Sequence, residues 1–192
     1  MRTLSPSDVP LGAAVFFHGS DDPIKAGSGA ILSGIIEDVT NAPWSHCGYL
    51  SANGEDLFES TIWHNVSGPQ WNKLVDRLPE YVDGGRVVAM PYLPKFAPNW
   101  EQVEAVSSNL VALRRVGRCP YAVEHLFGDL VDDTILEHLG IFEQVARYFM
   151  CKNGLVCSEC LAKVRGLSPW IGATPAQLAT RPDYGAPIQL IP

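Results

Sequence analysis

Four short apolar runs in the first half of the chain have the length and composition of β-strands. Residues 13–18 are continuously apolar as far as His18, which is typical of a buried strand. The stretch 44–50 alternates polar and apolar residues, and Asn53-Gly54 separates it from 56–61, so these two stretches predict a β-hairpin. A further apolar run at 86–90 predicts a fourth strand.

Apolar residues at helical spacing predict several helices between and after these strands. The strongest of these patterns covers 100–116, where Val103, Leu110 and Leu113 share one stripe and Gly117 follows the last turn. We also expect helices over 31–39, 70–81, 122–149, 155–164 and 174–178, and a last strand over 187–191. Strands and helices in this order indicate an α+β domain.

The predicted helix 155–164 carries a cysteine in its first turn, Cys157, and Gly166 ends it. A thiol at a helix N-terminus faces the positive end of the backbone dipole and free N–H groups, which favour the thiolate and make the sulfur a nucleophile. The same pattern also fits a small buried cysteine on the inner face of an ordinary helix. A nearby base would decide between these interpretations.

The predicted hairpin supplies a candidate base and a residue to orient it. His46 lies near the start of the first strand, and antiparallel pairing could bring Glu59 of the second strand beside it. A nucleophile, a base and an orienting residue are three parts of one mechanism, and here their chain order is His, Glu, Cys. The alternative for Glu59 is a strand carboxylate that faces water.

Length and charge narrow the class of protein. The chain has 192 residues, of which 46% are hydrophobic and 18% charged, so we expect one domain over 1–192. A formal charge of −7 argues against nucleic acid or an anionic membrane surface as a partner. The sequence predicts neither a transmembrane segment nor a secretory signal, so we expect a cytoplasmic protein as synthesised.

The five cysteines form no disulfide framework, because their number is odd and no signal peptide is predicted. Zinc could in principle be held by Cys151, Cys157 and Cys160 with His125 or His138. Only one pair has a short ligand spacing and it falls on a predicted helix, so we expect no metal. The carboxylates and histidines of 124–143 fit a solvated helix face better than a metal site.

Five segments together resemble the circularly permuted papain-like hydrolases of the NlpC superfamily, especially the YiiX/YaeF-like group. They are 44–50, 58–60, 117–121, 156–160 and 174–178. The resemblance implies a papain-like α+β fold in which a small antiparallel sheet packs against helices and the cysteine opens a helix. It further implies Cys157 as nucleophile, His46 as base and then acid, and Glu59 as the orienting residue. Tyr121 and Ser158 would then assist at the oxyanion or substrate.

These roles predict acyl transfer by a cysteine hydrolase without a cofactor. Relatives suggest a peptide or a lipid substrate, and we expect an amidase or endopeptidase acting on cell-wall peptides. Without a signal peptide, such a protein would be an effector exported by a contractile injection machine, with an export or immunity partner, or a phage protein. The alternatives are a lipid-directed acyl hydrolase or acyltransferase, and a catalytically silent binding module with the same fold.

Overall fold

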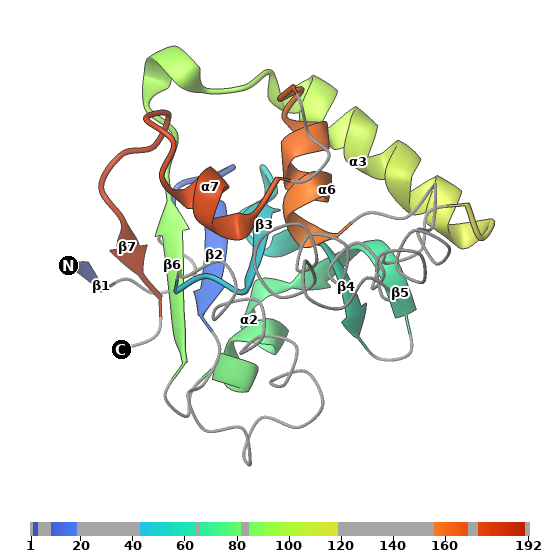
Figure 1. Cartoon of the computed structure of the whole chain (residues 1–192), viewed down its shortest axis with the longest axis horizontal. Coiled ribbons are helices and arrows are strands. Elements are labelled where there is room, and N and C mark those ends of the chain that lie inside the picture. Colours follow the sequence, from blue (N-terminus) through green and yellow to red (C-terminus); the bar gives the residue numbers. More distant parts are fainter. Residues whose placement is uncertain are drawn as a thin grey trace, which may run out of the picture.

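A seven-stranded sheet forms the centre of the protein (Figure 1), in the order β1-β7-β6-β2-β3-β4-β5. The structure is a computed structural model, and the residues described are 2–3, 9–18, 43–63, 66–81, 85–118, 156–168 and 173–190. The strands are β1 (Arg2–Thr3), β2 (Ala14–His18), β3 (His46–Leu50), β4 (Asp56–Trp63), β5 (Val66–Lys73), β6 (Arg86–Met90) and β7 (Ile188–Gln189). Neighbouring strands are antiparallel except for β1 and β7, so the predicted α+β class is confirmed.

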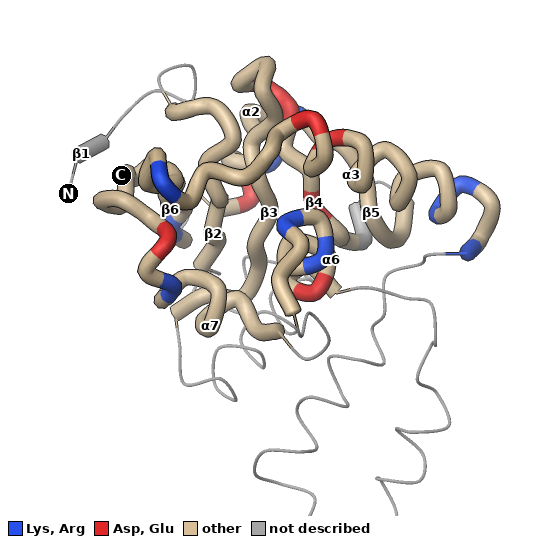
Figure 2. Tube along the Cα trace, turned by 90° about the horizontal axis from the view of Figure 1, so that it is seen from above, with Lys and Arg blue, Asp and Glu red and all other residues tan. Residues whose placement is uncertain are grey.

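Helices lie on both faces of this sheet. They are α2 (Leu74–Arg77), the 3-10 helices η2 (Leu78–Tyr81) and η3 (Pro94–Phe96), α3 (Trp100–Arg115), α6 (Cys157–Val164) and α7 (Pro175–Ala179). Figure 2 shows α2 and α6 on opposite sides of the strands. Among the described helices, none is long and apolar enough to cross a membrane.

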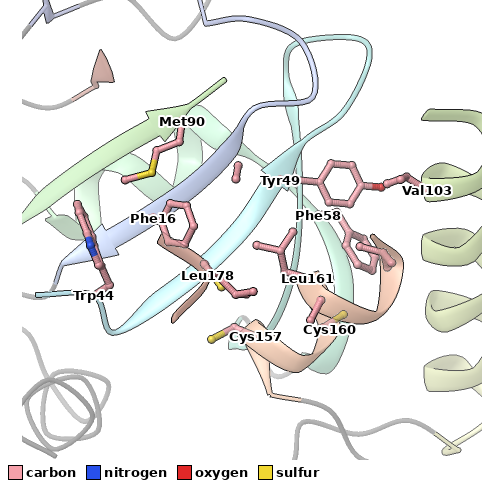
Figure 3. Packing of buried hydrophobic residues seen from close by; sticks show 14 of the residues in the cluster. Phe16, Trp44, Tyr49, Phe58, Met90, Val103, Cys157, Cys160, Leu161 and Leu178 are labelled. Atoms are coloured by element: carbon pink, nitrogen blue, oxygen red, sulfur yellow. The ribbon is translucent and has the colours of Figure 1, made fainter. Parts of the chain in front are cut away.

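The central strand β2 divides the core in two. Phe16 points into the cluster covered by α3, α6 and α7, and Phe17 points into the cluster beneath α2. Burial on both faces explains why residues 14–17 of this strand are all apolar and do not alternate. Figure 3 shows Leu161 of α6 and Leu178 of α7 in the first of these clusters, beside Phe16.

The predicted helix over 70–81 is wrong in its first part. Residues 66–73 form β5 along β4, and only 74–81 are helical. The error arises because Gln70 and Asn72 are polar but buried, so the inward face of this strand lacks the apolar signal of a strand. Trp71 faces the other cluster and is half-buried.

The other predicted elements fall into two groups. The strands at 13–18, 44–50, 56–61, 86–90 and 187–191 and the helices at 100–116, 155–164 and 174–178 are confirmed within a few residues wherever the structure describes them. The predicted helices 31–39 and 122–149 lie outside the described residues.

Candidate active site

The first residue of β3, His46, lies diagonally across the sheet from Glu59 of β4. The register pairs Glu59 with Gly48, two residues beyond the histidine. A Cβ atom at Gly48 would lie 2.5 Å from the carbonyl oxygen of Phe58 and 3.2 Å from the Cβ of Glu59. The absence of a side chain at this position therefore allows the two strands to approach and the two functional side chains to share one face.

The imidazole of His46 and the carboxylate of Glu59 form a short, buried ion pair. His46 Nε2 lies 2.5 Å from Glu59 Oε2. The ring of Phe17 packs beside the imidazole, at 5.4 Å between centroids, and Tyr81 packs on Phe17. These aromatic rings exclude water from one side of the pair, which strengthens its electrostatic attraction.

Two further side chains bind the same carboxylate. Asn72 of β5 donates its amide to Oε1 of Glu59 over 2.6 Å, and Nε of Arg77 in α2 lies 2.7 Å from the same oxygen. Nη2 of Arg77 donates to Oε2 over 3.3 Å. Burial alone would raise the pKa of Glu59, but Arg77, His46 and Asn72 together lower it from 4.5 to about 2. Glu59 is therefore a carboxylate throughout the physiological pH range.

Cys157 is the first residue of α6, and its position follows from the way this helix begins. The preceding residue, Val156, is extended, and its carbonyl oxygen accepts the N–H of Cys160 over 2.9 Å. The side chain of Glu159 accepts the N–H of Val156 over 3.3 Å, which fixes the entry of the chain into the helix. In such a first turn, the N–H groups lack partners within the helix and point toward the helix N-terminus.

The sulfur of Cys157 contacts two neighbouring residues of β3. The side chains of Cys47 and His46 and the backbone N–H of Cys47 lie close enough to this sulfur to lower its pKa. This N–H is available because the ladder between β3 and β4 begins only at Gly48. Since Nε2 of the imidazole faces Glu59, Nδ1 is the ring nitrogen left for the sulfur.

These contacts favour a charged pair. The side-chain hydrogen bond from Cys47 is the strongest of the effects that hold the pKa of Cys157 well below its usual value, and the His46 imidazolium adds to it against the effect of burial. Burial would lower the pKa of His46, but the Cys157 thiolate and Glu59 raise it from 6.5 to about 9. Both shifts favour a thiolate beside an imidazolium.

The structure brings together three of the residues singled out from the sequence, namely Cys157, His46 and Glu59. Ser158 follows in the first turn of α6 and is buried. Tyr121 lies outside the described residues. The two carboxylate ligands Asn72 and Arg77 and the thiol partner Cys47 were not expected. Because β5 lacks the apolar alternation of a strand, no sequence signal pointed to Asn72. Adjacency to His46 was the only sequence signal for Cys47.

No group of metal-ligating side chains is present in the part of the chain that the structure describes. Of the zinc ligands considered from the sequence, only Cys157 and Cys160 belong to that part. Both are buried in the core, and neither forms a disulfide with another described cysteine.

No protein-family model matches the chain, and no curated protein matches it significantly. The chemistry of the site therefore has to be inferred from its own geometry.

Proposed function

We propose that the protein is a cysteine-dependent acyl hydrolase with a circularly permuted papain-like fold. The observation that carries this proposal is the position of the His46 imidazole, which is bonded to the Glu59 carboxylate and lies near enough to the Cys157 sulfur for each to shift the pKa of the other. Burial of three polar groups alone would not require the order sulfur, imidazole, carboxylate. It is the order that a nucleophile, an acid–base residue and an orienting residue need.

The proposed reaction begins from the thiolate–imidazolium pair. The Cys157 thiolate attacks a carbonyl carbon, and the electron pair of the carbonyl double bond moves to the oxygen. Backbone N–H groups in the first turn of α6, including that of Cys157, would stabilise this oxyanion, and one such donor contributes about 3–4 kcal/mol to the transition state.

The leaving group then takes the proton of the His46 imidazolium, and a thioester to Cys157 remains. In the second half of the reaction the neutral imidazole accepts a proton from water as the water attacks the thioester. The thiolate leaves, and the acid product is released. Glu59 stays ionised in every step and stabilises the imidazolium, which loses its proton to the leaving group and is re-formed once when water attacks.

We propose an amide bond of a bacterial cell-wall peptide as the first substrate, reached through a dedicated export machine or during phage infection. The test is to incubate the protein with purified peptidoglycan and with phospholipid vesicles, and to measure new amines and released fatty acid respectively. New amines that disappear in Cys157→Ala support the amidase. Fatty acid released in their place would make the protein a lipid-directed acyl hydrolase.

A matched control is available one turn further along α6. Cys160 is as buried as Cys157 and belongs to the same cluster, but the groups that raise the pKa of His46 are Cys157 and Glu59. We expect Cys160→Ala to keep the activity that Cys157→Ala loses.

A second test needs no substrate. Alkylation by iodoacetamide at pH 6, read for each cysteine by peptide mass spectrometry, should label Cys157 at least about tenfold faster than Cys47, because a difference of one pKa unit is a tenfold difference in thiolate. Equal labelling of the two would remove the basis of the proposal.

A further inference from the structure

His46 alone does not keep the buried carboxylate of Glu59 ionised throughout a reaction cycle. The side chain of Glu59 is fully buried, and burial favours the protonated acid. A protonated carboxyl at this position would no longer stabilise the imidazolium of His46 by charge. A second cation is needed to keep the group ionised whenever His46 becomes neutral during a reaction cycle.

Arg77 is suited to this task by its position. Its side chain is almost completely buried, and its closest approach is to Oε1 of Glu59, whereas His46 binds Oε2. The closest contacts of the two cations are therefore with different oxygens of one carboxylate, and Nη2 of Arg77 reaches Oε2 only over 3.3 Å. Asn72 also donates to Oε1, so the carboxylate cannot rotate without losing a hydrogen bond.

Both the backbone of α2 and a second carboxylate position Arg77. The helix α2 continues directly from β5, and Leu74 in its first position is buried in the cluster beneath the sheet. The other end of the guanidinium binds Glu80 in η2. Arg77 is thus fixed at both ends.

We infer that Arg77 is a positioning residue that acts on His46 through Glu59, by keeping the buried carboxylate ionised and its Oε2 directed at the imidazole. This inference rests on the proposed function, because it assigns Arg77 a role in the same site. Under this inference the three proposed reactive residues are not sufficient. Glu59 orients His46 only while Arg77 supplies a positive charge beside the carboxylate.

The test is a double-mutant cycle on the reactivity of Cys157. The rate of alkylation by iodoacetamide is measured from pH 4 to pH 9 for the unmodified chain, Glu59→Gln, Arg77→Met and the double variant. We expect each single variant to slow alkylation at pH 6 about tenfold. The acidic limb of the pH–rate profile should also move upward by about one pH unit. The double variant should match Glu59→Gln within about twofold, because Arg77 has no carboxylate left to act on.

If Arg77 had only a structural role, the alkylation rates would differ from this expectation. Arg77→Met would then lower the alkylation rate at every pH without moving the acidic limb of the pH–rate profile, and this outcome would overturn the inference. A double variant about a hundredfold slower than the unmodified chain would overturn it too. An unchanged rate in Arg77→Met would overturn it as well. Arg77→Lys should recover part of the rate and of the pH profile, since it restores the charge without the two-point contact.

The design remains decisive if Arg77→Met alone does not fold. The double variant removes both buried charges together, and such replacements are often tolerated. Comparing it with Glu59→Gln then tests the inference: equal rates support it and a further tenfold loss contradicts it. A Cys157 that is no more reactive than Cys47 in the unmodified chain would instead refute the proposed function itself.

Discussion

The β4–β5 hairpin carries two clusters of carboxylates and cations whose chemistry is similar and whose surroundings are opposite. In the exposed hairpin cluster, Lys73 lies 2.9 Å from both Glu55 and Asp56. In the buried hairpin cluster, Arg77 and Asn72 bind Glu59, which in turn binds His46. Arg77 follows Lys73 by four positions and Glu59 follows Asp56 by three, so the clusters are neighbours in sequence.

The difference between the two clusters is burial. The side chains of Lys73 and Glu55 are 47% and 72% exposed, whereas those of Arg77 and Glu59 are 4% and 0% exposed. Exposed charges lose little when a partner is removed, because water and salt replace it. A buried charge without its partner has no replacement. Only the buried hairpin cluster can therefore control the protonation of a third group such as His46.

The largest effect is expected when one cation of the buried hairpin cluster is removed. Arg77→Met should lower the free energy of unfolding by about 3–5 kcal/mol, since Glu59 would be left as an uncompensated buried charge. Urea denaturation followed by circular dichroism measures this change.

The double variant Arg77→Met/Glu59→Gln serves as the control. It should recover most of the lost stability, because no buried charge is left without a partner. A double variant as unstable as Arg77→Met would mean that packing of the guanidinium, and not its charge, stabilises this region.

The next effect is the pH dependence of stability. The pKa of Glu59 is lowered from 4.5 to about 2 in the fold, so its contribution is complete above pH 4.5 and is lost as the pH falls toward 2. This shift corresponds to about 3 kcal/mol. The pKa of His46 is raised from 6.5 to about 9, so its contribution is complete below pH 6.5 and is lost as the pH rises through 9.

Urea denaturation at pH 5 and pH 2.5 tests the expected loss of stability at acidic pH. The unmodified chain should lose more stability between these values than Arg77→Met/Glu59→Gln, in which Glu59 no longer titrates. Parallel losses in the two proteins would show that other carboxylates dominate acid unfolding.

A smaller effect is expected from adding a side chain at Gly48, where β3 and β4 approach closely beside Glu59. In Gly48→Ala the new methyl group would meet the carbonyl oxygen of Phe58 at 2.5 Å, so β3 and β4 must separate. We expect a loss of about 1–3 kcal/mol in the free energy of unfolding, together with slower alkylation of Cys157.

Gly185→Ala is the matched control for this substitution. The nearest atom to a Cβ there lies at 3.6 Å, which is an ordinary contact, so the stability should change by less than about 0.5 kcal/mol. Equal effects of the two substitutions would argue against a special role for the close strand approach at Gly48.

The same two clusters show which residues of the site could be predicted from the sequence. His46, Glu59 and Cys157 were predictable, because a hairpin register and a helix start are local features that a sequence pattern specifies. Asn72 and Arg77 were not, since a polar inward face in β5 imitates the periodicity of a helix and hides the strand. The contact between Cys47 and Cys157 depends on how α6 docks on β3, and no local pattern encodes such docking.

The smallest effect is expected in the exposed hairpin cluster. Lys73→Met removes both ion pairs of the lysine, yet Asp56 keeps the side chain of Asn53 as a donor, and Asn53 also accepts the backbone N–H of Asp56. Water solvates the freed carboxylates, so the urea midpoint should not move measurably at 0.15 M salt. Alkylation of Cys157 should also keep its rate and pH profile. A shift of the midpoint as large as that of Arg77→Met would mean that distance along the hairpin, and not burial, decides what an ion pair contributes in this protein.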